Sequence, residues 1–207
     1  MAYGEFKRGV VSNERDVLFV NIDFGFGMGI LIGDLTCYAK SGFSGEFGQI
    51  PFFQNERICH CGKRGCLGTE TLDLALLEAV KARIKLGSSS VLSVRHTDVH
   101  QLRLEEIIKA ARQEDSLVAK LLSDIGDKLR KSIAMLINMF NPELVIFGGK
   151  VFETGDFTWL PIRNALNKFA LGLANNDTQL QLSLLGARAR VMGGCLIARG
   201  QVIFGCN

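Results

Sequence analysis

The sequence predicts an α/β fold, with a mixed sheet of about five strands flanked by helices. Three observations support this class. A short apolar segment near the N-terminus is followed by two more strand-like segments joined by a tight turn. Stretches with helical periodicity come next, and strand–helix pairs complete the chain. This order is typical of an antiparallel meander that leads into parallel crossovers.

The first strands are predicted close to the N-terminus. Residues 17–22 (VLFVNI) are apolar and partly β-branched, which favours a buried strand. Two further strands are expected over residues 27–32 and 35–39. Gly33-Asp34 separates them as a two-residue hairpin turn, so this part of the sheet is antiparallel.

Apolar residues with a period near that of the α-helix predict three helices in the middle of the chain. They are expected over residues 71–86, 104–112 and 117–140. Gly87 closes the first helix, and Asn141-Pro142 stops the last one. Residues 88–98 are polar, and we expect them to form a surface loop.

The last third of the chain predicts two strand–helix pairs. The run LVIF before Gly148-Gly149 is fully apolar, as expected for a buried parallel strand that runs into a turn. A helix with Pro161 near its first turn follows. The elements are expected at residues 144–147 (strand), 160–170 (helix), 180–184 (strand) and 190–199 (helix).

Three cysteines lie within eight positions, at C-x-C-x4-C spacing. Cys59, Cys61 and Cys66 are separated by glycines that let the backbone fold around one point. Thiolates are the ligands that zinc favours in closed structural sites, so the spacing predicts a structural Zn²⁺ site. The alternatives are unconnected buried or reactive cysteines, or a disulfide. The other cysteines, at positions 37, 195 and 206, are isolated and most simply small apolar residues.

The composition is that of an ordinary soluble globular protein, with 47% hydrophobic and 22% charged residues. A net charge of +3 is too small to indicate nucleic-acid or membrane binding. No apolar run approaches the roughly 20 residues that span a bilayer, and the N-terminus has no apolar signal-peptide core. We therefore expect a cytoplasmic protein, in which thiols stay reduced and bind metal.

The order of these motifs resembles the ROK family of repressors, open reading frames and sugar kinases, most closely its transcriptional repressors. The resemblance implies an actin-like ATPase (ribonuclease H-like) fold and covers essentially the whole chain. It implies that residues 17–207 form the C-terminal lobe and that residues 1–16 are a remnant of the N-terminal lobe or a connecting segment. The family's first phosphate loop, catalytic aspartate and DNA-binding helix-turn-helix are then not part of this chain. The matching segments are residues 2–5, 22–30, 44–49, 59–66, 144–149 and 192–194.

The resemblance assigns a sugar-binding segment to Ser44–Gln49 and makes Glu46 a hydroxyl acceptor. In the family a histidine three residues after this glutamate contacts the sugar and completes the zinc site. Here that position holds Gln49, ten positions before Cys59 as the family spacing requires. An amide oxygen is a poor zinc donor beside imidazole. The fourth ligand is therefore open between Gln49, water, His60 and another group.

A second glutamate of the family's sugar pocket is also replaced, because its position here is Gly68. Glu70 lies two residues further on and is the candidate substitute. The other interpretation of Glu70 is a solvated residue at a helix N-terminus. Since a charge-assisted hydrogen bond is worth about 1.5–3 kcal/mol, we expect sugar binding to be weakened relative to the family.

The same resemblance places Gly25 and Gly27 in a phosphate hairpin and Gly148 and Gly149 in a turn on the nucleotide side. Family kinases commonly carry Gly-Thr-Gly in this hairpin, where this chain has Asp23-Phe24-Gly25. A glycine-rich hairpin also needs no ligand to explain it. We therefore expect neither ATP binding nor sugar-kinase activity.

The leading hypothesis for function is the sugar-sensing and oligomerisation module of a ROK-type transcriptional repressor, with no direct DNA contact by this chain. The expected ligand is a small sugar or sugar phosphate. The first alternative is a fragment of a ROK sugar kinase, or a degenerate one, without independent activity. The second is a zinc-stabilised scaffold that binds no ligand.

Self-association is expected because a lone lobe exposes apolar residues such as Phe24 and Phe26. Four further phenylalanines are expected to cluster around the cysteines, either as core or as an interface. These are Phe43, Phe47, Phe52 and Phe53.

Overall fold

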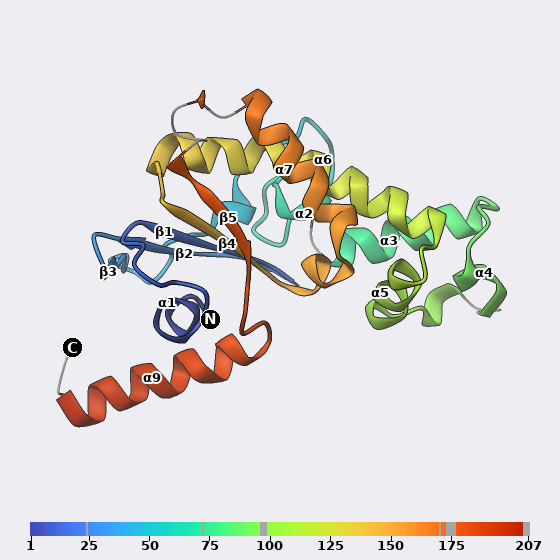
Figure 1. Ribbon diagram of the computed structural model, residues 1–207. Coiled ribbons are helices and arrows are strands. Elements are labelled where there is room, and N and C mark those ends of the chain that lie inside the picture. The colour runs from blue at the N-terminus through green and yellow to red at the C-terminus, as the bar shows by residue number, and fades with distance from the viewer. Residues whose placement is uncertain (24, 72, 96–98, 170, 173–176, 205–207) are drawn as a thin grey trace.

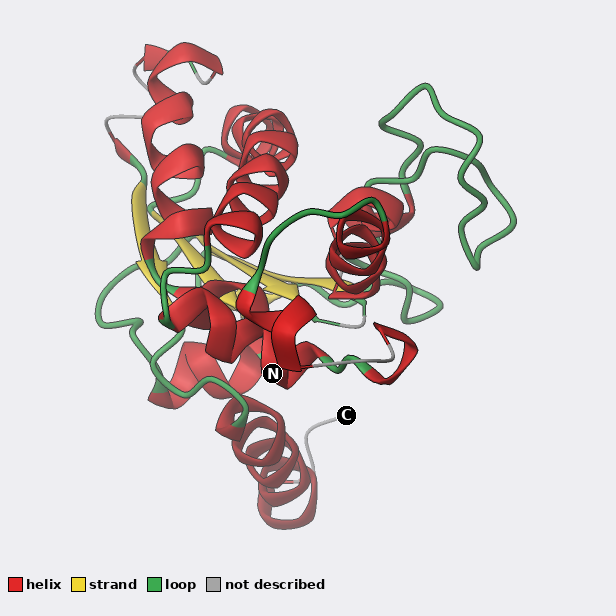
Figure 2. Ribbon diagram, turned by 90° about the vertical axis from the view of Figure 1, so that its right-hand side faces the viewer, coloured by secondary structure: helices red, strands yellow, loops and turns green. Residues whose placement is uncertain are grey.

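The computed structural model is a five-stranded sheet with helices on both faces (Figure 1). It describes residues 1–23, 25–71, 73–95, 99–169, 171–172 and 177–204. Figure 2 shows the strands edge-on between helices above and below them. The predicted α/β class and the mixed sheet of five strands are thereby confirmed.

The sheet has the order β3-β2-β1-β4-β5. β1 pairs antiparallel with β2 and parallel with β4, and β4 pairs parallel with β5. The antiparallel half and the parallel half therefore meet at β1, which lies in the middle of the sheet. The strands are β1 (Val17–Ile22), β2 (Phe26–Ile32), β3 (Leu35–Thr36), β4 (Leu144–Gly148) and β5 (Gln179–Leu182).

The predicted hairpin turn at Gly33-Asp34 is confirmed, since both residues have positive φ, at 56° and 68°. β3 ends at Thr36, three residues before the predicted end. The strand can pair only on the β2 side, and its residues are partly exposed. A short edge strand of this kind offers little unpaired backbone to other chains.

β1 divides its side chains between two cores because successive residues of a strand point to opposite faces. Leu18, Val20 and Ile22 join the larger core under the long helices. Val17 and Phe19 join a smaller core under the N-terminal helix. Burial of each large apolar side chain contributes about 1.5–3 kcal/mol, so both faces of β1 stabilise the sheet.

Two long helices cover the larger core, and α6 agrees with the prediction to within one residue. Asp115 caps α6 by accepting a hydrogen bond from the Val118 N–H at 3.0 Å. Asn141 ends it in the left-handed conformation, before Pro142. The helices on this face are α2 (Gly68–Thr71), α3 (Asp73–Lys85), α5 (Leu104–Arg112), α6 (Ser116–Phe140) and α7 (Asp156–Phe169).

The prediction of a loop over residues 88–98 is wrong in its middle, where α4 (Val91–Arg95) forms. Leu92 is buried there. The Asp115 carboxylate accepts hydrogen bonds from the Ser90 hydroxyl at 2.9 Å and from the Val91 N–H at 2.8 Å. The same carboxylate thus caps two helices, α4 and α6. The end of the predicted loop, residues 96–98, lies outside the described residues. The described residues also include short 3₁₀ segments at Phe47–Gln49 (η1), Val99–Gln101 (η2) and Lys150–Thr154 (η3).

α7 begins four residues before the predicted start, so Pro161 lies inside the helix and not near its first turn. The predicted end at residue 170 lies outside the described residues. The final helix, α9 (Arg188–Phe204), also begins earlier than residue 190. Helix ends are fixed by tertiary contacts that local periodicity does not record.

The N-terminal helix α1 (Ala2–Arg8) packs under the sheet and against α9 (Figure 1). Its Glu5 is fully buried and accepts hydrogen bonds from the Ser183 hydroxyl and from the Leu185 N–H. Phe6 belongs to the smaller core. No helix among the described residues has both the length and the apolar character needed to cross a membrane.

The predicted exposure of Phe26 is wrong, because its side chain is buried against Phe47 at a centroid distance of 5.7 Å. Phe24 lies outside the described residues. Phe52 and Phe53 pack edge to face at 5.3 Å on the larger core. Phe43 is 76% exposed, so it does not join a buried aromatic cluster.

Candidate metal centre and adjoining pocket

The three clustered cysteines converge on one point. The sulfur atoms of Cys59, Cys61 and Cys66 all lie within 4.8 Å of one another, and those of Cys61 and Cys66 are 3.6 Å apart. Two thiolates on one tetrahedral zinc, with Zn–S of about 2.3 Å, stand about 3.8 Å apart. A disulfide requires about 2.05 Å. The cluster therefore fits a metal and excludes a disulfide between these residues.

Hydrogen bonds of the knot backbone bring the sulfurs together. The Cys59 N–H donates to the Lys63 carbonyl at 2.7 Å, and the Gly62 N–H donates back to the Cys59 carbonyl at 2.9 Å. Gly62 and Gly65 both have positive φ, which lets the chain turn tightly around the sulfurs. Cys37 and Cys195 are exposed and outside this cluster, and Cys206 is not among the described residues.

The surroundings shift the pKa values of two of the thiols in opposite directions. Burial, with the neighbouring thiols, raises the pKa of Cys66 to about 12. The backbone hydrogen bond from Lys63 lowers the pKa of Cys61. A divalent cation supplies the charge that stabilises the buried thiolate and releases its proton.

Which group supplies the fourth ligand stays a prediction. In the described part of the chain, the histidine, cysteine and acidic side chains that lie close enough together to hold a metal ion are those of the three cysteines. The Gln49 side chain donates to Glu46 at 2.7 Å on the pocket side, while its main-chain carbonyl accepts from the Cys66 sulfur at 3.4 Å. The residues thus fit a three-cysteine site, and the Gln49 side chain is engaged elsewhere.

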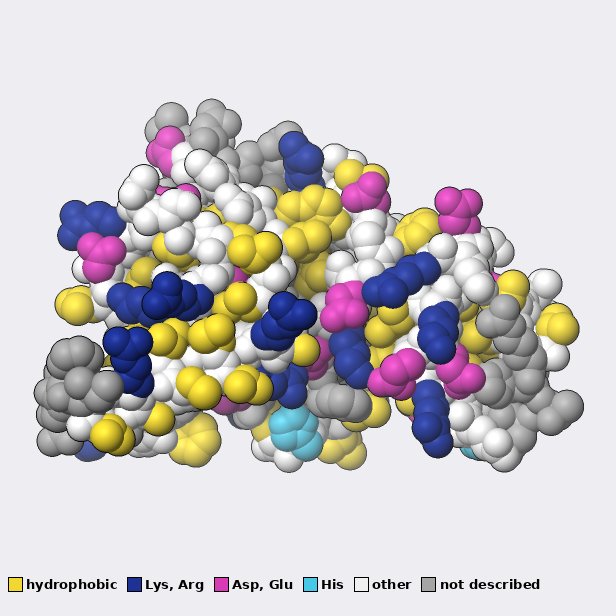
Figure 3. All heavy atoms as spheres, turned by 60° about the horizontal axis from the view of Figure 1, so that its bottom comes forward, with side chains coloured by type: hydrophobic (Ala, Val, Ile, Leu, Met, Phe, Trp, Pro, Cys, Tyr) yellow, Lys and Arg dark blue, Asp and Glu magenta, His cyan; other side chains and the backbone are white. Residues whose placement is uncertain are grey.

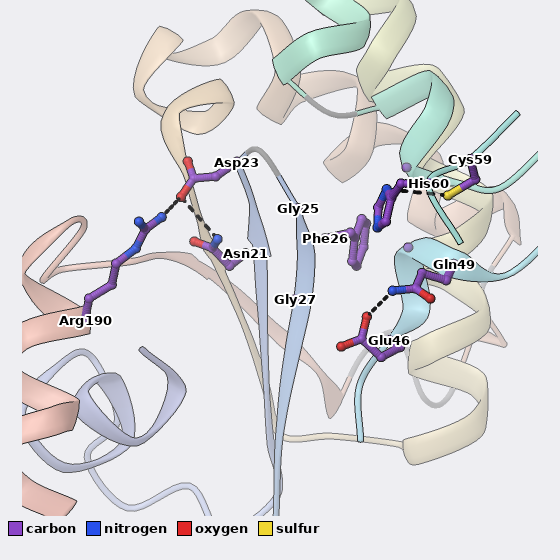
Figure 4. Close-up of a pocket in the computed structure, with 12 residues that line it drawn as sticks. Asn21, Asp23, Gly25, Phe26, Gly27, Glu46, Gln49, Cys59, His60 and Arg190 are labelled. Atoms are coloured by element: carbon purple, nitrogen blue, oxygen red, sulfur yellow. Dashed lines mark hydrogen bonds and ion pairs between the residues drawn. The ribbon is translucent and has the colours of Figure 1, made fainter. Parts of the chain in front are cut away.

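A cavity of about 380 Å³ adjoins the metal site (Figure 4). Glu46, Gln49 and His60 stand on one side of the β1–β2 hairpin, and Asp23 and Arg190 stand on the other. The structure thus brings two of the three residues predicted to bind sugar into one pocket. The lining residues are Asn21, Asp23, Gly25, Phe26, Gly27, Glu46, Gly48, Gln49, Cys59, His60, Gly68 and Arg190.

The segment that carries Glu46 is held against β2 by a glycine. Gly45 has φ of +80°, and a Cβ built there would overlap the Met28 carbonyl oxygen. Phe47, two residues on, is buried against Phe26 of β2. Local backbone geometry and aromatic packing therefore fix the carboxylate of Glu46 at the pocket.

Glu70 does not line this pocket, and it is not solvated as one interpretation proposed. Its buried carboxylate accepts from Lys128 at 2.7 Å and from Asn55 at 2.9 Å, and it pairs with Arg57 at 3.1 Å. These contacts tie α6 to the segment before the knot. The arrangement gives Glu70 three partners within the fold.

The other end of the pocket is formed by an ion pair that sequence patterns did not reveal. The Arg190 guanidinium donates to the Asp23 carboxylate at 2.6 Å. The same carboxylate accepts from the Asn21 amide at 3.2 Å and from the Lys150 N–H at 2.9 Å. The charge of Asp23, expected to face a phosphate site, is therefore neutralised within the fold.

A second cavity of about 350 Å³ lies beyond this ion pair, and Asp23 and Arg190 line both cavities. Gly25 and Gly27 belong to the first cavity, and Gly148 and Gly149 to the second. Gly149 has φ of +111°, and a Cβ there would overlap the Ile22 carbonyl oxygen. The glycines predicted to face phosphate are thus divided between two spaces.

One further buried acid escaped the sequence analysis. Asp73 begins α3, and neither carboxylate oxygen has a hydrogen-bond partner among the described residues. Its N–H donates to the Asp23 carbonyl at 3.3 Å. Burial and then the Asp23 charge raise the pKa of Asp73 to about 7. No local sequence signal marks such a residue, because an acid at a helix start is usually exposed.

Comparison with known proteins gives one family. The ROK family model matches residues 1–201. A putative xylose repressor from Caldicellulosiruptor sp. (strain Rt8B.4) is 32% identical over 192 residues, which are 93% of this chain and 48% of the repressor. The chain thus spans about half the length of that curated relative.

Two solved structures resemble the fold closely. One is a ROK family transcriptional regulator described as a homologue of the E. coli MLC protein, with a TM-score of 0.86 and 28% identity over 96% of this chain and 49% of the regulator. The other is a ROK family glucokinase from Streptomyces griseus in complex with glucose and AMPPNP, with a TM-score of 0.84 and 26% identity over 96% of this chain and 65% of the kinase. With the family match over nearly the whole sequence, these findings show that the chain belongs to the ROK family.

Proposed function

We propose that this chain is the sugar-sensing and self-associating module of a cytoplasmic ROK-type transcriptional regulator, held together by a structural zinc ion. The observation that carries the proposal is the pocket itself. Glu46 and Gln49 face one cavity directly beside the three-cysteine cluster, and the Asp23–Arg190 ion pair lies at the opposite end. A carboxylate and an amide in one small cavity suit the recognition of sugar hydroxyls.

The ion pair favours sensing over phosphoryl transfer. Transfer requires the phosphate donor and the attacking hydroxyl to be in line, with a base to orient the hydroxyl. Arg190 and Asp23 stand between the cavity with Glu46 and the cavity with Gly148 and Gly149. Both carboxylates that line the first cavity already accept hydrogen bonds, Asp23 from Arg190 and Glu46 from Gln49.

The metal in this proposal has a structural role. Three thiolates carry three negative charges, which makes the bound cation a poor Lewis acid. The cysteine knot that the metal closes supports the pocket wall, because Cys59 belongs to the metal cluster and also lines the pocket. We propose in addition that residues 1–16 derive from the N-terminal lobe or its connection, and that residues 17–207 form the C-terminal lobe.

The relatives support a regulator and keep a second candidate open. The putative xylose repressor and the Mlc-like regulator are similar over almost all of this chain, and so is the glucokinase. The second candidate is accordingly a kinase fragment, or a degenerate kinase, without independent activity. The whole-protein activities of these relatives involve more residues than the part that matches here.

The test is calorimetric titration of the zinc-loaded protein with D-xylose, D-glucose, N-acetylglucosamine and the 6-phosphates of the last two. We expect one of these to bind. Glu46→Gln should weaken that binding about 10- to 100-fold, since it removes a charge-assisted hydrogen bond. Exposed Glu78→Gln, on α3, is the matched control. Turnover above background with ATP in a coupled kinase assay would favour the second candidate instead.

Self-association is supported by exposed apolar side chains on α9. Val191 is 70% exposed and Val202 is 85% exposed. Figure 3 shows apolar side chains gathered along this helix, with basic side chains beside them. Contiguous exposed patches of this kind mark interaction surfaces. Light scattering should report a dimer or larger species at tens of micromolar, and Val191→Lys should shift it toward monomer.

A further inference from the structure

We propose that His60 supplies the imidazole which this chain lacks at position 49, and that it contacts the sugar and not the metal. This inference rests on the proposed function of the pocket. It concerns a residue that lies between two metal-binding cysteines and was open as a fourth ligand on sequence grounds.

The position of His60 places it on the pocket. It lines the same cavity as Glu46 and Gln49. Figure 4 shows its ring on the side of the hairpin where Glu46 and Gln49 stand, and Phe26 lines the same cavity. Three groups with complementary chemistry therefore meet there: a carboxylate that accepts, an amide, and an imidazole that both donates and accepts.

The distances separate His60 from the metal cluster. In a tetrahedral site all four ligand atoms lie within about 4 Å of one another. The group of ligand atoms within 4.8 Å consists of the three cysteine sulfurs and does not include a ring nitrogen of His60. Among the described cysteines, the ring approaches the sulfur of Cys59, with Nδ1 at 3.8 Å.

This contact leaves the second ring nitrogen available. Among the described residues, the side-chain atom in polar contact with the His60 ring is the sulfur of Cys59. Nδ1 faces that sulfur, so Nε2 is the atom that can bond to a ligand hydroxyl. The flat rings of His60 and Phe26, which both line the cavity, add apolar surface of the kind that packs against the C–H face of a pyranose. The ligand class is thus a neutral sugar ring with adjacent hydroxyl groups.

The backbone of the knot transmits the effect of the metal to this contact. His60 is held on both sides by residues that would bind the cation, so its ring is positioned only when the knot is closed. Loss of the metal should therefore weaken sugar binding, although the cation does not touch the sugar. Sensing and metal binding are coupled through one residue.

The experiment compares three proteins: the unmodified chain, His60→Ala and His60→Gln. His100→Ala is the control, since that exposed histidine on η2 is not among the residues that line the cavity. Zinc content is measured by mass spectrometry, folding by thermal unfolding, and binding by calorimetry with D-xylose, D-glucose and N-acetylglucosamine.

We expect all variants to keep about one zinc per chain and an unchanged unfolding temperature. His60→Ala should bind the preferred sugar about 10- to 100-fold more weakly, and His60→Gln should recover part of the affinity, since it keeps a donor and an acceptor. Loss of zinc from His60→Ala would identify the imidazole as a metal ligand and overturn the inference. Unchanged affinity would also overturn it while leaving the proposed function intact. If the unmodified protein binds a 6-phosphate but none of these sugars, the inference fails and the proposed function stands; if it binds neither class, both fail.

Discussion

Replacing Asp73 by asparagine is expected to stabilise the protein at neutral and alkaline pH. The Asp73 side chain is 1% exposed, and neither of its carboxylate oxygens has a hydrogen-bond partner among the described residues. The negative charge of Asp23 lies nearby, and Lys150 only partly offsets it. An ionised carboxylate in this place is unfavourable, because burial removes its hydration without supplying a partner.

The size of the effect follows from the pKa. Burial first, and then the Asp23 charge, raise the pKa of Asp73 from 3.8 to about 7. Because the folded state binds this proton more tightly, the stability it contributes is complete below about pH 4 and is lost as pH rises through about 7. At about 1.4 kcal/mol for each pH unit, the full difference is about 4 kcal/mol. Local relaxation reduces it, and we expect about 2–4 kcal/mol at pH 8.

The assay is urea unfolding of the zinc-loaded proteins between pH 5 and pH 8, with the free energy of unfolding taken by linear extrapolation. Asp73→Asn should gain stability relative to the unmodified protein progressively across this range. Exposed Asp124→Asn on α6 is the control and should run parallel to the unmodified protein. A difference between Asp73→Asn and the unmodified protein that does not change with pH would refute the reasoning.

Three other changes test the metal, the ion pair and the loop. Cys66→Ser should abolish zinc binding and lower the unfolding temperature, by about 2–4 °C for each kcal/mol lost, as followed by mass spectrometry and circular dichroism. Arg190→Ala should destabilise the protein by about 1–3 kcal/mol, because buried Asp23 loses a partner, and a double-mutant cycle with Asp23→Asn should show strong coupling. Gly45→Ala should cost about 1–3 kcal/mol in urea unfolding and weaken sugar binding, since its positive φ and the Met28 carbonyl leave no room for a Cβ. Independence of Asp23 and Arg190, or an unperturbed Gly45→Ala, would contradict the respective contact.

The elements that the sequence predicted well are those specified by local pattern. The apolar run of β1, the Gly33-Asp34 turn and the long period of α6 each carry their own signal. The convergence of the cysteines was also predictable, since eight positions with intervening glycines allow little else.

What escaped prediction depends on partners far along the chain. α4 forms in a polar stretch because Asp115, twenty-four positions after Val91, caps it. Arg190 reaches Asp23 across 167 positions, and Glu70 is buried by Lys128, 58 positions away. Such pairings are properties of the folded chain, and no window of sequence contains both members.

Arg190, which pairs with Asp23, lies in the first turn of α9, so a change in this ion pair acts at one end of the helix. A helix of 17 residues is about 25 Å long, so a tilt of about 10° at its fixed end displaces its tip by about 4 Å. If a rearrangement at the mouth of the cavity tilted α9, the displacement would therefore be larger at the far end of the helix than at the ion pair (Figure 1).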